Sequence, residues 1–232
     1  MILASGQNVD FMIHGLKKIE LFGQELWITT THVSVLVIMG VIILVACIIR
    51  ANLKGPDEKP GMLQSFAEIA IEMLENMVAG IMGDKGAKFI NYIGTIFVFV
   101  LLSNISGIFG LRPPTADFGV TLPLGIMTFL IVQYQNIKNN KFGAFTDLFQ
   151  PMPVLFPINL IGEIATPFSL GLRLFGNIIS GTVIVALYYG MVPVLFKIGV
   201  PAVLHVYFDL FSGCIQAYVF CMLTMVFINN KQ

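Results

Sequence analysis

Charged side chains are scarce in this chain of 232 residues, where they make up 11% of the sequence against about a quarter in soluble proteins. The 13 basic and 13 acidic residues also cancel. The chain therefore has neither the basic excess of a nucleic-acid-binding protein nor the acidic excess of a solvated, disordered tail. Because hydrophobic residues make up 56% of it, a soluble domain is excluded and a membrane protein is expected.

Cysteine is scarce as well: Cys47, Cys214 and Cys221 form no CxxC pair and lie in apolar runs. Thiols in such runs pack as small hydrophobes, so we expect no disulfide framework, no metal site and no cofactor. Residues 1–25 lack the basic start and short apolar run of a cleavable signal peptide. We expect them to form an external segment, and the first span to insert by itself.

Long charge-free runs are what the chain has in abundance. A helix needs roughly 20 apolar residues to cross the ~30 Å hydrocarbon layer. Residues 60–83 instead carry Glu68, Glu72 and Glu75 at helical spacing opposite an apolar stripe, so we expect an amphipathic helix along the membrane surface. The runs that are long enough to cross are 26–49, 89–111 and 118–137.

Two longer apolar runs follow, over 154–190 and 201–228. At ~1.5 Å per residue the first is about 55 Å long, so both are expected to be strongly tilted. A short link through Pro193 and Lys197 makes them an antiparallel hairpin. The sequence therefore predicts a single membrane domain over 1–232, an all-α integral membrane protein with five transmembrane helices plus a surface amphipathic helix, the last two spans forming a long tilted hairpin.

The basic residues predict how the chain is oriented. Five crossings place the termini on opposite sides of the membrane, and basic loops favour the cytoplasm. Four basic residues lie on the N-terminal side and a larger group on the C-terminal side, so we expect the N-terminus outside and the C-terminus in the cytoplasm. The larger group is Arg50, Lys54, Lys59, Lys85, Lys88, Lys138, Lys141 and Lys231.

Arg173 is the most informative residue within a predicted span. A guanidinium does not lose its proton, and insertion scales put its cost at the centre of a span at about 2.5–3.5 kcal/mol. At about 100° per residue several polar residues share its helix face, and Glu163 lies to one side of them. These residues are Thr166, Ser169, Asn177 and Ser180.

The last span carries a second polar face. Its four polar residues follow the i, i+4, i+7, i+11 pattern of one helical arc. Two interpretations stay open for such residues: structural contacts between helices, at about 1 kcal/mol each, or an ion path. Ionisable residues within spans favour the ion path, so Glu163, Arg173 and Asp209 carry that interpretation. The four residues are His205, Asp209, Ser212 and Gln216.

Two further motifs are rejected. Gly171 to Gly176 has the glycine spacing of a phosphate loop, but Asn177 replaces the required lysine and the segment lies in an apolar helix, so no nucleotide is expected to bind. Asn104 begins a glycosylation pattern but falls within a predicted span. We interpret Asn104 as a polar group that packs helices together.

The nonapeptide over 169–177, Ser-Leu-Gly-Leu-Arg-Leu-Phe-Gly-Asn, closely resembles the signature helix of subunit a of the bacterial F-type ATP synthase, in the subunit 6 family. Further resemblances lie over 104–110, 113–117, 121–124 and 216–220. The resemblance implies a five-span stator subunit of the membrane sector in the bacterial cell (inner) membrane. Its implied partners are a rotating ring of c subunits, the b subunits of a peripheral stalk and the lipid bilayer.

The resemblance also implies roles in ion translocation. Arg173 matches the essential arginine that faces the ion-carrying carboxylate of each c subunit. Asn177 and Gln216 match polar positions along the aqueous paths, and Glu163 and Ser169 match further polar positions on the same helix as Arg173. Such a subunit is no enzyme on its own, since the chain has no nucleotide-binding motif.

This chain departs from the commonest pattern at two positions. Many relatives have Glu or His five residues after the asparagine, and His or Glu seven residues before the glutamine. Here those positions hold Thr182 and Asp209. Because Thr182 does not titrate, we hypothesise that His205, one turn from Asp209, substitutes in part.

The expected mechanism has two offset half-channels separated by Arg173, which couple the flow of H⁺ or Na⁺ to ATP synthesis. Both ions stay open because the site that selects the ion belongs to the ring. A secondary ion transporter is an alternative, but it would need substrate sites in repeated halves, which five unequal spans do not show. A non-transporting membrane scaffold is another, but it leaves the polar faces of Arg173 and Asp209 unexplained.

Overall fold

The structure of the chain is a computed structural model. Within the residues that it describes, five helices are long and apolar enough to cross a membrane. The predicted all-α integral membrane fold with five spanning helices is therefore confirmed. Residues 1–14 and the predicted link through Pro193 and Lys197 lie outside the described part of the chain. The described residues are 15–21, 24–54, 60–109, 111–140, 154, 156–191 and 200–231.

An antiparallel hairpin of β1 (Gly15–Leu21) and β2 (Gln24–Thr29) precedes the first long helix. It takes up the start of the run predicted to span from residue 26, so α1 covers Thr30–Ala51 instead. The cause is local: the His32 ring accepts a hydrogen bond from the Thr29 amide (3.4 Å) and lies 2.7 Å from the Thr29 hydroxyl. Satisfying these groups at the first turn fixes the start of the helix.

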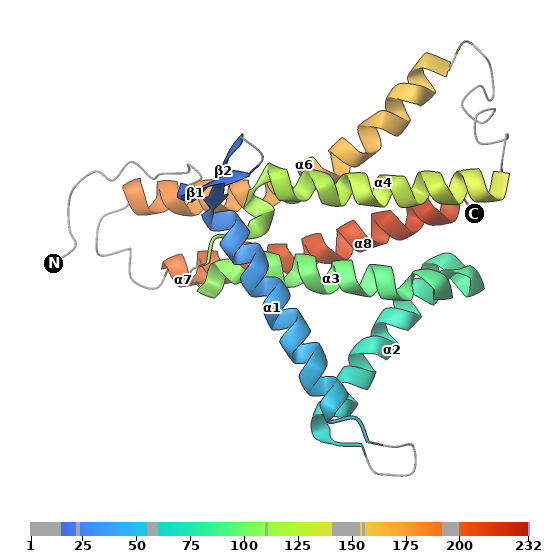
Figure 1. Cartoon of the computed structure of the whole chain (residues 1–232), viewed down its shortest axis with the longest axis horizontal. Helices are drawn as coiled ribbons and strands as arrows, with labels where there is room; N and C mark the ends of the chain where they lie inside the picture. Colours follow the sequence, from blue (N-terminus) through green and yellow to red (C-terminus); the bar gives the residue numbers. More distant parts are fainter. Residues whose placement is uncertain are drawn as a thin grey trace.

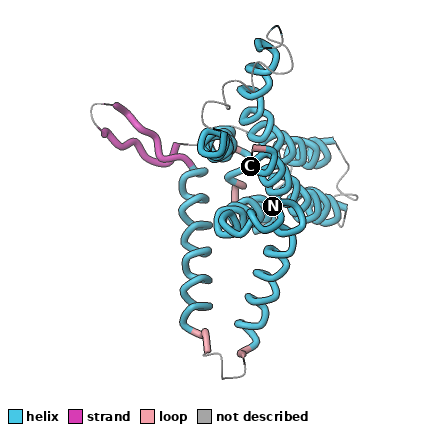
Figure 2. The backbone as a smooth tube through the Cα atoms, turned by 90° about the vertical axis from the view of Figure 1, so that its right-hand side faces the viewer, coloured by secondary structure: helices cyan, strands magenta, loops and turns pink. Residues whose placement is uncertain are grey.

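Helix α2 (Met62–Met82) is the predicted amphipathic helix. Glu68 and Glu75 are exposed on one face, and Phe66 and Met73 are exposed on the other. Figures 1 and 2 show α1 and α2 leaving the other helices and approaching each other at their far ends. An apolar face that the chain itself leaves uncovered is typical of a helix that rests against lipid.

Most of the rest of the described chain is helical, with short 3-10 segments at several joints and a π-helical segment, η7, before α8. Helix α3 is shorter than the predicted span 89–111, because the chain tightens where the Ser106 hydroxyl donates to the Ser103 carbonyl (2.7 Å). The elements in order are η1 (Gly83–Phe89), α3 (Ile90–Ile105), η2 (Ser106–Phe109), η3 (Pro114–Ala116), α4 (Phe118–Asn140), α6 (Phe156–Met191), α7 (Val200–His205), η7 (Val206–Ser212) and α8 (Gly213–Asn230).

Helix α6 forms the predicted long hairpin with the last helical run. Two contacts show that the two runs are antiparallel, because the later residue of one run meets the earlier residue of the other. Ser212 of η7 bonds to Asn177, and Lys231 after α8 bonds to Glu163. Figure 1 shows α6 bent, with its first part turned away from α4 and α8. Pro167 lies inside this helix, and a proline removes a backbone hydrogen bond and kinks the helix around it.

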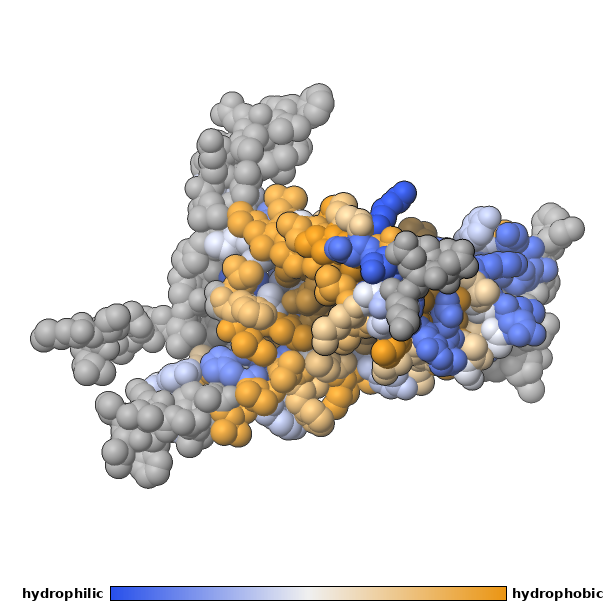
Figure 3. All heavy atoms as spheres, turned by 90° about the horizontal axis from the view of Figure 1, so that it is seen from below, coloured by the Kyte–Doolittle hydropathy of each residue, from blue (hydrophilic) through white to orange (hydrophobic). Residues whose placement is uncertain are grey.

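The core lies where α3, α4, α6 and α8 meet, with α4 along α6 and α3 along α8. Ile93, Val100, Leu174, Phe220 and Met225 are almost fully buried there. Figure 3 shows apolar side chains covering the middle of one face, with hydrophilic side chains gathered toward its right-hand end. The hydrocarbon layer requires an apolar band of this kind.

Glycine lets α4 and α6 touch backbone to backbone. A Cβ atom added at Gly171 would lie 3.1 Å from the Thr121 carbonyl oxygen and the Leu122 Cα. A Cβ atom at Gly125 would overlap the carbonyl oxygen of Pro167. A side chain at Gly125 would force the two backbones apart and one at Gly171 would be tight, so glycine at both points lets α6 lie close to α4.

Replacing Gly125 with alanine should therefore destabilise the protein, because the α4 and α6 backbones must separate. Overpacking of this kind costs about 1–3 kcal/mol. Gly40→Ala is the matched control, since a Cβ atom at Gly40 in α1 meets nothing within 4 Å. The fraction of folded subunit that survives heating in detergent, followed by size-exclusion chromatography, measures both. Equal survival of the two variants would contradict this account of the packing.

Candidate functional site

The polar residues of the α6 hairpin lie at three levels along α6. Glu163 lies near the start of the helix, Arg173 near its middle and Thr182 further on. At ~1.5 Å per residue, Glu163 and Thr182 are each about 14–15 Å from Arg173 along the helix. The three levels differ in what surrounds them, so each is described by itself.

Arg173 at the middle level is exposed on the surface of the chain. With the described residues its guanidinium makes no hydrogen bond and no ion pair. Ser169 and Ser180 are exposed on the same helix, and a Cβ atom at Gly176 would meet nothing within 4 Å. A charge in the membrane needs a counter-charge or a polar environment, and small residues let another helix approach it closely.

Asn177 connects the two arms of the hairpin one turn after Arg173. Its Oδ1 accepts a hydrogen bond from the Ser212 hydroxyl (3.0 Å), and its carbonyl oxygen accepts one from Ser180 (2.9 Å). Gln216 follows on α8, 8% exposed, and its Nε2 has no hydrogen-bond partner among the described residues. A buried amide with an unused donor is costly, so it marks a place where water or another polar group fits.

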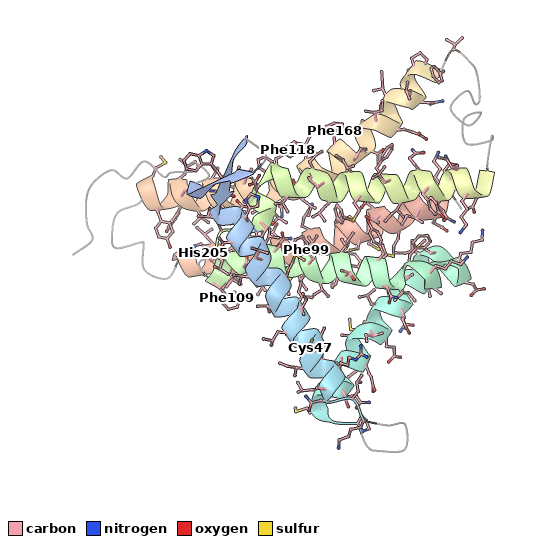
Figure 4. All side chains as sticks on the ribbon, in the orientation of Figure 1. Cys47, Phe99, Phe109, Phe118, Phe168 and His205 are labelled. Carbon is pink, nitrogen blue, oxygen red and sulfur yellow. The ribbon has the colours of Figure 1, made fainter. Side chains whose placement is uncertain are left out.

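The third level opens into a cavity of about 490 Å³, here called the Asp209 cavity. Nδ1 of His205 lies 2.8 Å from Oδ2 of Asp209. The Asp209 side chain is 17% exposed and that of His205 41%, so the carboxylate lies deeper. Figure 4 shows His205 and Phe109 at the same end of the molecule. The polar side chains that line the cavity are Arg112, Thr182, Tyr189, His205 and Asp209.

Two local features place Asp209 there. A Cβ atom at Gly107 would lie 3.5 Å from the Asp209 carboxylate, so η2 packs directly against it. Asp209 also lies in η7, a π-helical segment over Val206–Ser212, whose hydrogen bonds join residues five apart instead of four. The α-helical spacing assumed for the predicted arc from His205 to Gln216 is therefore interrupted, and π turns are frequent at functional sites.

The first level holds a smaller cavity of about 120 Å³, here called the Glu163 cavity. Oε1 of Glu163 forms an ion pair with the Lys231 ammonium at 2.9 Å. Its other oxygen, Oε2, accepts a hydrogen bond from Gln133 of α4 at 3.0 Å. The polar side chains that line the cavity are Thr128, Gln133, Glu163, Thr166, Asn230 and Lys231.

Other polar groups have structural partners. Asn104 is fully buried: its amide donates to the Gly213 carbonyl (2.9 Å) and its Oδ1 accepts from Thr115 (2.7 Å). The interpretation of Asn104 as a helix-packing group is confirmed. Thr182 reaches the Asp209 cavity, but its hydroxyl donates to the Ile179 carbonyl of its own helix (2.8 Å).

Sequence reasoning assigned no site role to Arg112, Gln133 or Lys231. Arg112 and Lys231 served only to orient the chain, although the predicted antiparallel hairpin already implied that the end of the last span lies near the start of α6. That implication could have placed Lys231 beside Glu163. Gln133 gives no such signal, because which face of α4 meets α6 depends on their packing.

Comparison with known proteins adds the family. The family model described as ATP synthase A chain matches residues 32–229. The chain is 39% identical over 223 residues to "ATP synthase subunit a, sodium ion specific" of Propionigenium modestum, which covers 88% of this chain and 74% of that protein. It is 36% identical over 188 residues to ATP synthase subunit a of Priestia megaterium, a match that covers 75% of this chain and 80% of that protein. It is 30% identical over 243 residues to ATP synthase subunit a of Bacillus subtilis, a match that covers 95% of this chain and 98% of that protein.

The Asp209 cavity should admit water. A cysteine in place of Thr182, which lines it, is expected to react with a small, water-soluble methanethiosulfonate at least about tenfold faster than one in place of Ile178. Ile178 lies one turn away on α6 and is 5% exposed, and a thiol reacts only where the reagent has access. Mass spectrometry of the purified subunit gives both rates, with Cys47, Cys214 and Cys221 replaced beforehand. Equal rates would show that the cavity is closed to water.

Proposed function

Because this chain belongs to the subunit a family of F-type ATP synthases, we propose that it is the stator subunit of the membrane sector, with two half-channels that carry H⁺ or Na⁺ to and from the c-ring. The observation that carries the proposal is the arrangement along α6. Along the helix, a cavity with ionisable side chains in its lining lies on either side of Arg173, one with Asp209 and His205 and one with Glu163 and Lys231. The exposed guanidinium lies between them.

The Asp209 cavity serves as the entrance. Its carboxylate attracts a cation, and His205, in contact with it at 2.8 Å, takes part in passing the ion on. Asn177, Gln216 and the neighbouring Ser212 continue the polar path toward Arg173. This arrangement supports a partial role for His205 in place of the Glu or His that many relatives have where this chain has Thr182.

Arg173 provides the switch between the two paths. A fixed cation beside a ring carboxylate stabilises the charged form of that carboxylate and so favours release of its bound ion. The same charge repels a cation that would leak straight from one cavity to the other. The residues around Arg173 are small, so a ring helix can approach it closely. They are Ser169, Gly176 and Ser180.

The charge distribution supports the orientation. The Glu163 cavity lies at the end of the molecule where α4 and α8 finish, with Lys138 and Lys231, and Arg112 lies at the Asp209 cavity. The positive-inside rule then places the Glu163 cavity and the C-terminus at the cytoplasm, and the N-terminus outside. The compared relatives are bacterial, so we expect the membrane to be the bacterial cell (inner) membrane.

The chain contributes no catalytic step of its own. Each charge moved yields roughly 2.3 kcal/mol per 100 mV of membrane potential, so several ions are needed for one ATP, and rotation of the ring passes that energy to nucleotide-binding subunits. The b subunits of the peripheral stalk hold this chain still. The whole chain, 1–232, acts as one membrane domain, and the ring selects H⁺ or Na⁺.

Arg173→Ala should abolish ion-coupled ATP synthesis and ATP-driven pumping in vesicles that contain the whole complex, while the catalytic head, once detached, still hydrolyses ATP. The reason is that Arg173 is the one basic residue in α6. Ser180→Ala, on the same exposed helix face, is the control and should keep coupled transport. Assays with and without sodium identify the ion. Pumping that survives Arg173→Ala refutes the proposed function.

His205→Ala should slow ion-driven ATP synthesis, since it removes the ring whose Nδ1 lies 2.8 Å from the Asp209 carboxylate. An orienting partner of this kind is typically worth about tenfold or more in activity. Tyr207→Ala is a control on the same helical run, where Tyr207 is exposed and does not line the Asp209 cavity. The rate at a fixed ion gradient is the measurement. Unchanged synthesis by His205→Ala removes His205 from the path.

A further inference from the structure

The end of α8 is anchored, and Lys231 is not part of a loose tail. The Asn229 side chain donates to the Ile81 carbonyl of α2 (3.1 Å), and Asn139 of α4 donates to the Lys231 carbonyl (3.3 Å). These bonds tie the last residues of the described chain to two other helices. They position Lys231 so that its Nζ lies in the Glu163 cavity, 2.9 Å from Oε1 of Glu163.

The Glu163 carboxylate has both oxygens engaged. Lys231 holds Oε1 and Gln133 holds Oε2, from α8 and α4 respectively. Glu163 and Lys231 are the only ionisable side chains among the described residues that line this cavity. Each is 26% exposed, so the pair is partly shielded but still open to exchange. The cavity therefore carries no net charge while the pair is formed.

A neutral cavity has a consequence for ions that pass through it. A lone carboxylate would bind each outgoing cation and slow its release, because opposite charges attract strongly where water is partly excluded. With Lys231 in place, a cation reaches Glu163 only by displacing the ammonium, and the ammonium then displaces the cation. Each exchange leaves the carboxylate with one cationic partner, so no unpaired charge is left behind.

We propose that Lys231 is a further residue of the cytoplasmic half-channel, a tethered counter-cation that competes with the transported ion for Glu163 and so speeds the release of that ion. This inference rests on the proposed function, because it needs ions to leave through the Glu163 cavity. It concerns any monovalent cation that a carboxylate binds, H⁺ and Na⁺ alike.

The test is ion-driven ATP synthesis by the whole complex in vesicles, with a fixed potential and sodium chloride titrated on the side of the catalytic head. Where synthesis does not need sodium, the pH of that side is titrated instead. Lys231→Gln should lower the concentration of cation that halves the rate by about fivefold, the effect expected of one partly exposed ion pair. Lys231→Arg should keep the wild-type concentration.

A double variant distinguishes the proposed role of Lys231 from a structural one. Removing the carboxylate as well, in Glu163→Gln/Lys231→Gln, should return the half-inhibitory concentration to the wild-type value. Lys138→Gln removes a lysine from the same end of the molecule, where Lys138 lies over the Tyr134 ring at 5.8 Å, and should leave that concentration unchanged.

Three results would overturn the role of Lys231: no shift in Lys231→Gln, an equal shift in Lys231→Arg, or a shift that persists in the double variant. If the double variant has no activity, the comparison of Lys231→Gln with Lys231→Arg decides. Assembly of each variant is checked by the amount of subunit in the purified complex. Arg173→Ala in the same assay keeps the two proposals apart. If Arg173→Ala retains synthesis, the proposed function fails whatever Lys231 does. If Arg173→Ala loses synthesis, the Lys231 variants alone decide whether Lys231 has the proposed role.

Discussion

The constraint on which this structure depends is a fixed positive charge, that of Arg173, which lies in the middle of an apolar helix and has no counter-charge among the described residues. Arg173 is exposed and unbonded among the described residues, while the two carboxylates of the hairpin are already engaged. Glu163 is held by Lys231 and Asp209 by His205. The charge of Arg173 therefore remains available to a carboxylate from outside the chain, which in the proposed function is that of the ring.

Close packing between helices keeps Arg173 apart from the carboxylates of Glu163 and Asp209. Gly125 and Gly171 allow backbone contact between α4 and α6, and a Cβ atom at Gly181 would lie 3.2 Å from Phe208. At Gly213 the distance to the Asn104 Cβ would be 2.9 Å. Because backbones in contact cannot slide without losing these contacts, α6 keeps one register against its neighbours, and the two cavities stay on opposite sides of Arg173.

Much of the fold could be predicted because its causes are local. Length and hydrophobicity alone predict the spanning helices, and helical periodicity alone predicts that Arg173 and Asn177 lie on the same face of one helix. Other features depend on distant partners. The hairpin of β1 and β2, the π turn around Asp209 and the early end of α3 at Ile105 have no strong local signal, since strand pairing and helix distortion are decided by what packs against them.

The sequence by itself determined that this is a membrane protein, which residues carry charge within it and which family its signature helix resembles, because composition and a short motif do not depend on how the helices meet. The sequence also predicted that His205 lies one turn from Asp209, but only the tertiary structure decided the pairings between helices: Gln133 and Lys231 with Glu163, and no described residue with Arg173. Those pairings join residues up to 68 positions apart. No local pattern encodes them, because they exist only once α4, α6 and α8 are packed.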